Sequence, residues 1–86
     1  MHPLAFLEVY MIRVMVNGAG GKMGREVVKA VHNDPELTLV GGIDPTKAGQ
    51  DVGSVAGIEQ LGITMNASID EVLDTNKSDV IVDFTN

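Results

Sequence analysis

A glycine-rich run, Gly18-Ala19-Gly20-Gly21-Lys22-Met23-Gly24, constrains the fold of this chain more than any other feature. Before it, Ile12–Asn17 is β-branched and apolar on both faces, as a strand inside a parallel sheet requires. After it, residues 22–33 place their apolar side chains in one stripe of a helix. A strand, a glycine turn and an amphipathic helix in this order predict an α/β fold. The predicted stripe consists of Met23, Val27, Val28, Ala30 and Val31.

The next segments continue the alternation. The helix is expected to end at Asn33-Asp34-Pro35, because the residue before a proline avoids the α-helical region. Leu37–Ile43 is a second predicted strand, although it contains two glycines. We expect a loop over residues 44–57, which are rich in glycine and polar side chains, and a short strand over residues 63–65.

The end of the chain predicts one more helix and one more strand. Ser68 and Glu71 match a capping box that begins the helix, and residues 79–84 form the strand. Strands that alternate with helices pair in parallel, and their crossovers are right-handed in about 98% of cases. The sequence therefore predicts a small parallel sheet with the first strand in the middle.

Composition and charge exclude several classes of function. The chain of 86 residues has no cysteine, which rules out disulfides, thiolate metal sites and cysteine nucleophiles. No apolar run approaches the ~20 residues of a membrane span, and the net charge of −6 argues against binding nucleic acid. We therefore expect one small cytoplasmic domain. The acidic excess lies in residues 44–86, so the neutral first half is the better place for an anion.

The glycine-rich run has the chemistry of a phosphate-binding turn. Glycines let the backbone approach a ligand closely, and the helix that follows offers unpaired N–H groups and partial positive charge to a pyrophosphate. Gly18 and Gly20 fit the G-x-G-x-x-G fingerprint, but Met23 occupies its third glycine position. Gly18, Gly21 and Gly24 fit G-x-x-G-x-x-G instead. A tight turn without any ligand is the alternative.

Asp44 fits the acidic residue that binds an adenosine ribose in dinucleotide-binding folds. It follows the second predicted strand and lies 20 positions after Gly24. Its charge disfavours a 2′-phosphate, whereas Lys22 and Lys47 offset that repulsion, so we expect both NADH and NADPH as cofactors. A simple turn beginning at Asp44-Pro45 is the alternative.

The ends of the predicted strands should meet at one site. In a parallel sheet, all carboxyl ends lie at one edge, where ligands bind. Here those ends are Gly18, Asp44 and Phe84-Thr85. The sequence therefore predicts a Rossmann-like three-layer α/β fold, a partial nucleotide-binding domain with its site at this edge.

Four other residues have simpler expected roles. Met23 is expected to pack between helix and sheet, and Lys22 either contacts ligand or is a solvated helix residue. His2 and His32 have no partners at metal-ligand spacing, so no metal site is predicted. The sequence provides no account of Asp83 within the last strand.

The segment IRVMVNGAGGKMGREVVKAV, followed by DVIVDFT, resembles the start of 4-hydroxy-tetrahydrodipicolinate reductase, also called dihydrodipicolinate reductase. The resemblance covers residues 11–86. It implies a reductase of the diaminopimelate route to lysine that reduces a cyclic imine-type dicarboxylate with NADPH or NADH. By motif position, Asp44 would bind the adenosine ribose, Lys22 would lie near a 2′-phosphate, and Phe84 and Thr85 would line the nicotinamide side. The residues that would wrap the pyrophosphate are Gly18, Ala19, Gly20, Gly21, Lys22 and Met23.

The resemblance reaches only the front part of that family, whose substrate domain comes later in the chain. We therefore expect residues 12–86 to be a truncated N-terminal dinucleotide-binding domain, and residues 1–11 a leader extension. Such a chain would bind nucleotide without turnover and hold no catalytic residue. The full-length family is homo-oligomeric, and the open edge of the last strand predicts self-association. The alternatives are the front of another dehydrogenase and a non-catalytic α/β module.

Overall fold

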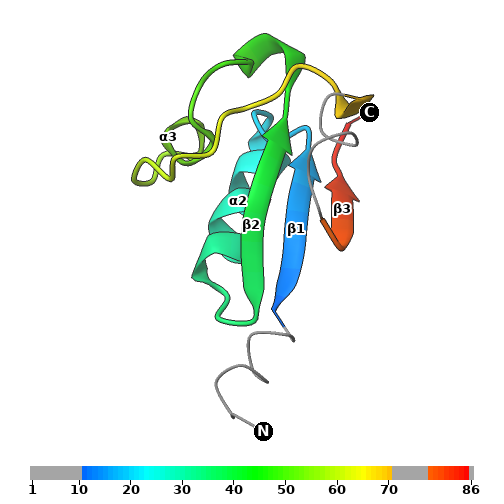
Figure 1. Ribbon diagram of the computed structural model, residues 1–86. Helices are drawn as coiled ribbons and strands as arrows, with labels where there is room; N and C mark the ends of the chain where they lie inside the picture. Colours follow the sequence, from blue (N-terminus) through cyan, green and yellow to red (C-terminus); the bar gives the residue numbers. More distant parts are fainter. Residues whose placement is uncertain (1–10, 71–77, 86) are drawn as a thin grey trace, which may run out of the picture.

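Three parallel strands form the centre of the computed structural model, which describes residues 11–70 and 78–85. The strand order is β2-β1-β3, so the first strand is central, as predicted (Figure 1). All three long predicted strands and the first helix are confirmed, the last strand being one residue shorter at each end. The elements are β1 (Ile12–Asn17), α2 (Lys22–Asn33), β2 (Leu37–Ile43), the 3-10 turn η1 (Pro45–Lys47), α3 (Val52–Ala56) and β3 (Val80–Asp83).

The helix α2 packs along one face of this sheet. It ends where Asp34, the residue before Pro35, becomes extended, with φ −91° and ψ 121°. The buried face consists of Gly24, Val28 and Val31. None of the described helices has the length and apolar character needed to cross a membrane.

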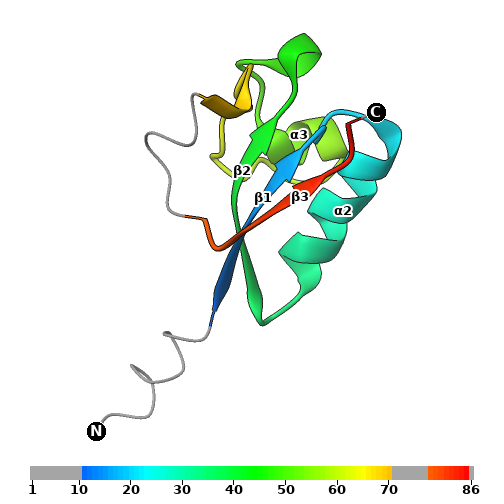
Figure 2. The same ribbon diagram turned by 90° about the vertical axis from the view of Figure 1, so that its right-hand side faces the viewer.

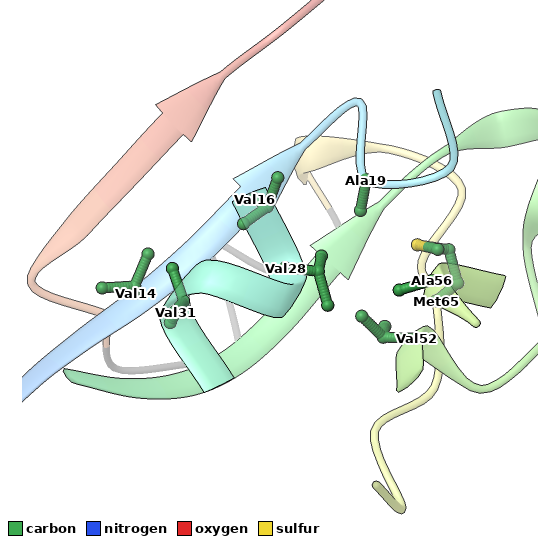
Figure 3. Close-up of a cluster of buried hydrophobic side chains, with 8 residues drawn as sticks. All are labelled: Val14, Val16, Ala19, Val28, Val31, Val52, Ala56 and Met65. Carbon is green, nitrogen blue, oxygen red and sulfur yellow. The ribbon is translucent and has the colours of Figure 1, made fainter. Parts of the chain in front are cut away.

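The main apolar core lies between this helix face and the sheet. Val14 and Val16 point from β1 towards Val28 and Val31 of α2, and α3 extends the cluster at one end (Figure 3). Every member of this core is apolar, and Ala19 of the glycine turn is one of them. Its members are Val14, Val16, Ala19, Val28, Val31, Val52, Ala56 and Met65.

A second, smaller cluster covers the opposite face of the sheet. Met15 and Ile43 are 1% and 2% exposed there and pack against Ile69 and Ile81. Both faces of β1 are thus buried, as its continuous apolar sequence predicts. Helical backbone begins at Ile69, but most of the predicted second helix, with Glu71, lies outside the described residues, as do residues 1–10 of the expected leader.

The two glycines of β2 have distinct packing roles. The register between β1 and β2 shifts after Val14, so that Met15 lies opposite Gly41. A Cβ on Gly42 would lie 2.9 Å from Val52 and 3.0 Å from the sulfur of Met65. The glycines that weaken this strand in the sequence therefore make room for core side chains.

The predicted loop over residues 44–57 is partly wrong, because it contains η1 and α3. Asp51 begins α3 by accepting hydrogen bonds from the backbone N–H of Ser54 at 2.9 Å and of Leu61 at 3.0 Å. The short strand predicted over residues 63–65 is also wrong: the structure has only isolated bridges, from Thr64 to Asp51 and from Asn66 to Ile43. The carboxylate of Asp51 thus stabilises a helix in a segment whose composition alone predicts a loop.

Candidate functional site

The glycine turn is anchored to the end of β2. The backbone N–H groups of Gly18 and Ala19 both donate to the carbonyl of Ile43, at 2.8 and 3.1 Å. Gly18 has φ +85°, which disfavours any residue with a Cβ. Ala19 is 1% exposed and packs in the core. These two residues therefore build the turn, and their N–H groups are already used within the protein.

Three glycines of the turn leave no room for a side chain. A Cβ on Gly18 would lie 3.1 Å from the carbonyl carbon of Phe84, which follows β3. A Cβ on Gly24 would overlap the carbonyl oxygen of Gly18, and one on Gly20 would overlap the carboxylate of Asp44. The turn is thus in contact with the carboxyl ends of both neighbouring strands.

Gly21 differs from the other nine glycines of the chain. Its φ of −78° is accessible to any residue, and a Cβ there would make only an ordinary contact, 3.5 Å from the carbonyl oxygen of Gly18. Four of the remaining glycines have positive φ, and at the other five a Cβ would lie within 3.1 Å of a neighbouring atom, which at Gly41 is the methyl end of Met15. Neither backbone geometry nor internal packing therefore requires glycine at position 21.

The first turn of α2 presents unused hydrogen-bond donors. The first bond of the helix runs from the N–H of Arg25 to the carbonyl of Gly21, at 2.9 Å. The N–H groups of Lys22, Met23 and Gly24 precede it and have no partner within a helix. Gly21 provides no side-chain cap, and the helix dipole adds partial positive charge at this end. These groups suit an anion such as a pyrophosphate.

A pocket of about 430 Å³ opens in front of these donors. It lies between the start of α2 and the end of β3, two segments that Figure 2 shows side by side. The predicted packing of Met23 between helix and sheet is wrong: the residue is 59% exposed and lines this pocket, because Gly24 makes the close contact instead. The lining residues are Gly21, Lys22, Met23, Gly24, Asp83, Phe84 and Thr85.

Asp83, which the sequence left unexplained, fixes the far side of the pocket. Its Oδ1 accepts hydrogen bonds from the backbone N–H of Thr85 at 2.9 Å and from the Thr85 hydroxyl at 2.6 Å. These bonds lower the pKa of Asp83, the hydroxyl contributing most. The sequence does contain a signal for this contact, the Asp-x-Thr spacing at the end of a strand. Asp44 and Thr46 have the same spacing after β2 and make the same contacts.

Asp44 lies on the other side of the turn and is nearly buried, with 9% of its surface exposed. Its Oδ1 accepts from the N–H and hydroxyl of Thr46, at 2.9 and 2.8 Å. Burial alone would raise the pKa of Asp44, but hydrogen bonds from Thr46 and from the Gly20 amide, together with the nearby charge of Lys47, lower it. The residue is therefore held as a carboxylate, and Lys47 is the cation beside it.

The structure brings the predicted site residues to one edge of the sheet, but in two groups. Lys22 and Met23 share the pocket with Phe84 and Thr85. Asp44 and Lys47 contact the opposite side of the turn at Gly20. The glycine turn separates the two groups, as expected for a ligand that crosses it.

His32 lies away from this edge. Its Nε2 is 3.7 Å from a carboxylate oxygen of Glu59, on the exposed surface between α2 and the segment after α3. Within residues 11–70 and 78–85, no three histidine or acidic side chains come together as metal ligands would. His2 lies outside the described residues.

Comparison with known proteins agrees with this architecture. A family model described as the N-terminus of dihydrodipicolinate reductase matches residues 12–86. The chain is 46% identical over 74 residues to the 4-hydroxy-tetrahydrodipicolinate reductase of Syntrophomonas wolfei, which covers 86% of this chain and 28% of that protein. It is 48% identical over 81 residues to the protein of the same name from a Synechocystis species, which covers 87% of this chain and 30% of that protein.

A third relative gives the same result. The 4-hydroxy-tetrahydrodipicolinate reductase of Paraburkholderia phymatum is 43% identical over 77 residues, which covers 86% of this chain and 28% of that protein. The chain therefore spans less than a third of the length of these curated relatives. The resemblance inferred from the sequence is confirmed.

Proposed function

Because the chain belongs to the dihydrodipicolinate reductase N-terminal family, we propose that it is the nucleotide-binding part of a 4-hydroxy-tetrahydrodipicolinate reductase and binds NADH or NADPH. The bound cofactor supplies a hydride, and the residues described above hold its phosphates and riboses. Reduction of a cyclic imine-type dicarboxylate is then the activity of the whole enzyme. In this proposal, residues 12–86 form the dinucleotide-binding unit and residues 1–11 an extension of it.

The single observation that carries the proposal is the glycine at position 21. The fold has no need of it, yet it lines a pocket directly in front of three unpaired N–H groups. A residue that is glycine without an internal reason is best explained by a ligand that approaches its backbone. A pyrophosphate matches both the donors and the partial positive charge at this helix end.

Asp44 supports binding of the adenosine ribose on the other side of the turn. Its carboxylate accepts hydrogen bonds from Thr46 on one oxygen and from the Gly20 amide. A carboxylate offers about four lone-pair positions, so capacity remains for a ribose hydroxyl. Its hydrogen bonds to protein groups fix its orientation before a ligand arrives.

Calorimetric titration with NADPH and NADH tests this function. We expect the unmodified chain to bind both, and a saturating nucleotide to raise its melting temperature. Gly21→Ala should weaken binding about tenfold, because the added methyl group meets the phosphates, a loss of roughly 1.4 kcal/mol. Its free energy of unfolding should change by less than about 1 kcal/mol, because reduced entropy of the unfolded chain opposes a poorer helix cap.

Lys29→Ala is the matched control for this experiment. Lys29 lies on the same helix, pairs with Glu26 at 2.7 Å and does not line the pocket. Nucleotide affinity should therefore stay within about twofold of the unmodified chain, since exposed ion pairs contribute little. If neither nucleotide binds, or Gly21→Ala binds as well as the unmodified chain, the glycine turn is structural and the chain is a non-catalytic α/β module.

The two lysines should distinguish NADPH from NADH. Lys47 lies beside Asp44, where a 2′-phosphate would be placed, whereas Lys22, to which the resemblance gave that role, lines the pocket at the start of α2. Lys47→Ala should weaken NADPH binding about fivefold and leave NADH binding nearly unchanged. Lys22→Ala should weaken both equally, because both nucleotides carry the pyrophosphate. Equal effects of Lys47→Ala on both nucleotides would contradict this assignment.

A further inference from the structure

Among the described residues, those at the end of β3 present only hydrogen-bond acceptors to the pocket. An ionised carboxylate has no proton to donate, so the contact of 2.6 Å between Asp83 and the Thr85 hydroxyl requires Thr85 to be the donor. The backbone N–H of Thr85 donates to the same Oδ1 at 2.9 Å. Both donors of Thr85 are thus committed to Asp83.

Two acceptor positions remain on this pair. Thr85 Oγ1 keeps its lone pairs, and among the described residues no donor reaches Asp83 Oδ2. Both side chains are exposed and line the pocket. The opposite wall, at the start of α2, presents the N–H groups of Lys22, Met23 and Gly24 and the ammonium of Lys22.

We infer that Asp83 is a positioning residue that makes Thr85 an acceptor for a neutral donor group of the nicotinamide nucleoside, either a ribose hydroxyl or the carboxamide. This inference rests on the proposed function and adds the role of Asp83 and the kind of ligand group, a hydrogen-bond donor, that the end of β3 accepts. Phosphate oxygens, which only accept, are attracted to the α2 wall and repelled by Asp83. Hydroxyl and amide donors are attracted to the β3 wall.

The test compares nucleotides that differ in the groups they bring to β3. NADPH carries both candidate donors, ADP-ribose carries the second ribose without nicotinamide, and ADP carries neither. Thr85→Val should reduce the ratio of NADPH to ADP affinity about fivefold, the effect of one lost hydrogen bond. Thr85→Ser, which keeps the hydroxyl, should retain the original ratio within about twofold.

Asp83→Ala tests the positioning role itself. It should lower the same ratio about as much as Thr85→Val, and the double variant should be no worse than either single variant, because the two residues act as one unit. If ADP-ribose is weakened with NADPH, the donor is the ribose hydroxyl; if only NADPH is weakened, the donor is the carboxamide. Both residues are exposed, so melting curves should confirm that every variant folds.

The outcomes separate this inference from the proposed function. An unchanged ratio in Thr85→Val, equal weakening of ADP and NADPH, or failure of Thr85→Ser to restore affinity would overturn the positioning role alone. If the unmodified chain binds none of the three nucleotides, the proposed function fails and the inference with it. Additive effects of Asp83→Ala and Thr85→Val would show that the two residues act independently, which also overturns it.

Discussion

Gly18 is the residue on which the geometry of the turn depends most. Its φ of +85° and its contact with the carbonyl of Phe84 each oppose a side chain. Gly57 has nearly the same φ, +86°, but open space around its Cβ position. We expect Gly57→Ala to cost about 1–2 kcal/mol of unfolding free energy and Gly18→Ala to cost more. Urea denaturation measures the free energy of unfolding of both variants. The difference between the two losses gives the contribution of the contact between Gly18 and Phe84, which follows β3.

Equal losses in the two variants would show that β3 is not held against the turn. The sharp turn at Gly18 can be predicted from the sequence, since glycines between a strand and a helix indicate one. The roles of Gly21 and Asp83 cannot, because each depends on which residues face it across the pocket. The exposure of Met23 could not be predicted for the same reason. Helical periodicity does not show that Gly24, rather than Met23, packs closely against Gly18.

At the scale of elements, the helix α3 depends on the carboxylate that caps it. Partial burial opposes ionisation of Asp51, but hydrogen bonds from the backbone amides of Leu61, Ser54, Ile63 and Gly62 outweigh it and lower its pKa from 3.8 to about 2. Because the folded pKa lies below the unfolded value, the ionised group stabilises the fold above about pH 4. That contribution is lost as the pH falls towards about 2.

Asp51→Asn should therefore lower the melting temperature at neutral pH, because the amide replaces a charged acceptor that holds four backbone N–H groups. The difference between the variant and the unmodified chain should shrink as the pH falls from about 4 to about 2. Thermal melts followed by circular dichroism over this range measure it. Glu36→Gln, which changes an exposed carboxylate, is the control. A difference that does not vary with pH would mean that the charge of Asp51 does not matter.

The long elements were predictable from the sequence, whereas the short ones were not. Apolar periodicity and Pro35 give β1, α2 and β2 with their observed ends. The five residues of α3 are too few to show a period, and a short isolated helix is unstable in water. Asp51, whose partners lie ten to twelve residues further along, determines that segment. Only the tertiary contact reveals the helix.

At the scale of the whole molecule, the predicted strand order is confirmed. β1 lies between two edge strands, and these edges differ. The end of β2 is bridged by Asn66, whose N–H donates to Gly42 at 2.9 Å. Among the described residues, β3 pairs only with β1, so its outer edge carries unpaired backbone groups.

This open edge leads us to propose that the chain self-associates through β3. Sedimentation velocity should show an average mass that rises between micromolar and millimolar concentration. Val80 is 45% exposed on β3, and Val80→Lys should keep the chain monomeric, because a charge on an edge strand blocks pairing. Ile12→Lys is the matched control, since Ile12 is 42% exposed on the central strand, where it pairs with Leu37 of β2 and lies outside the stretch that pairs with β3. If both lysines abolish association equally, general apolar exposure rather than strand pairing holds the copies together.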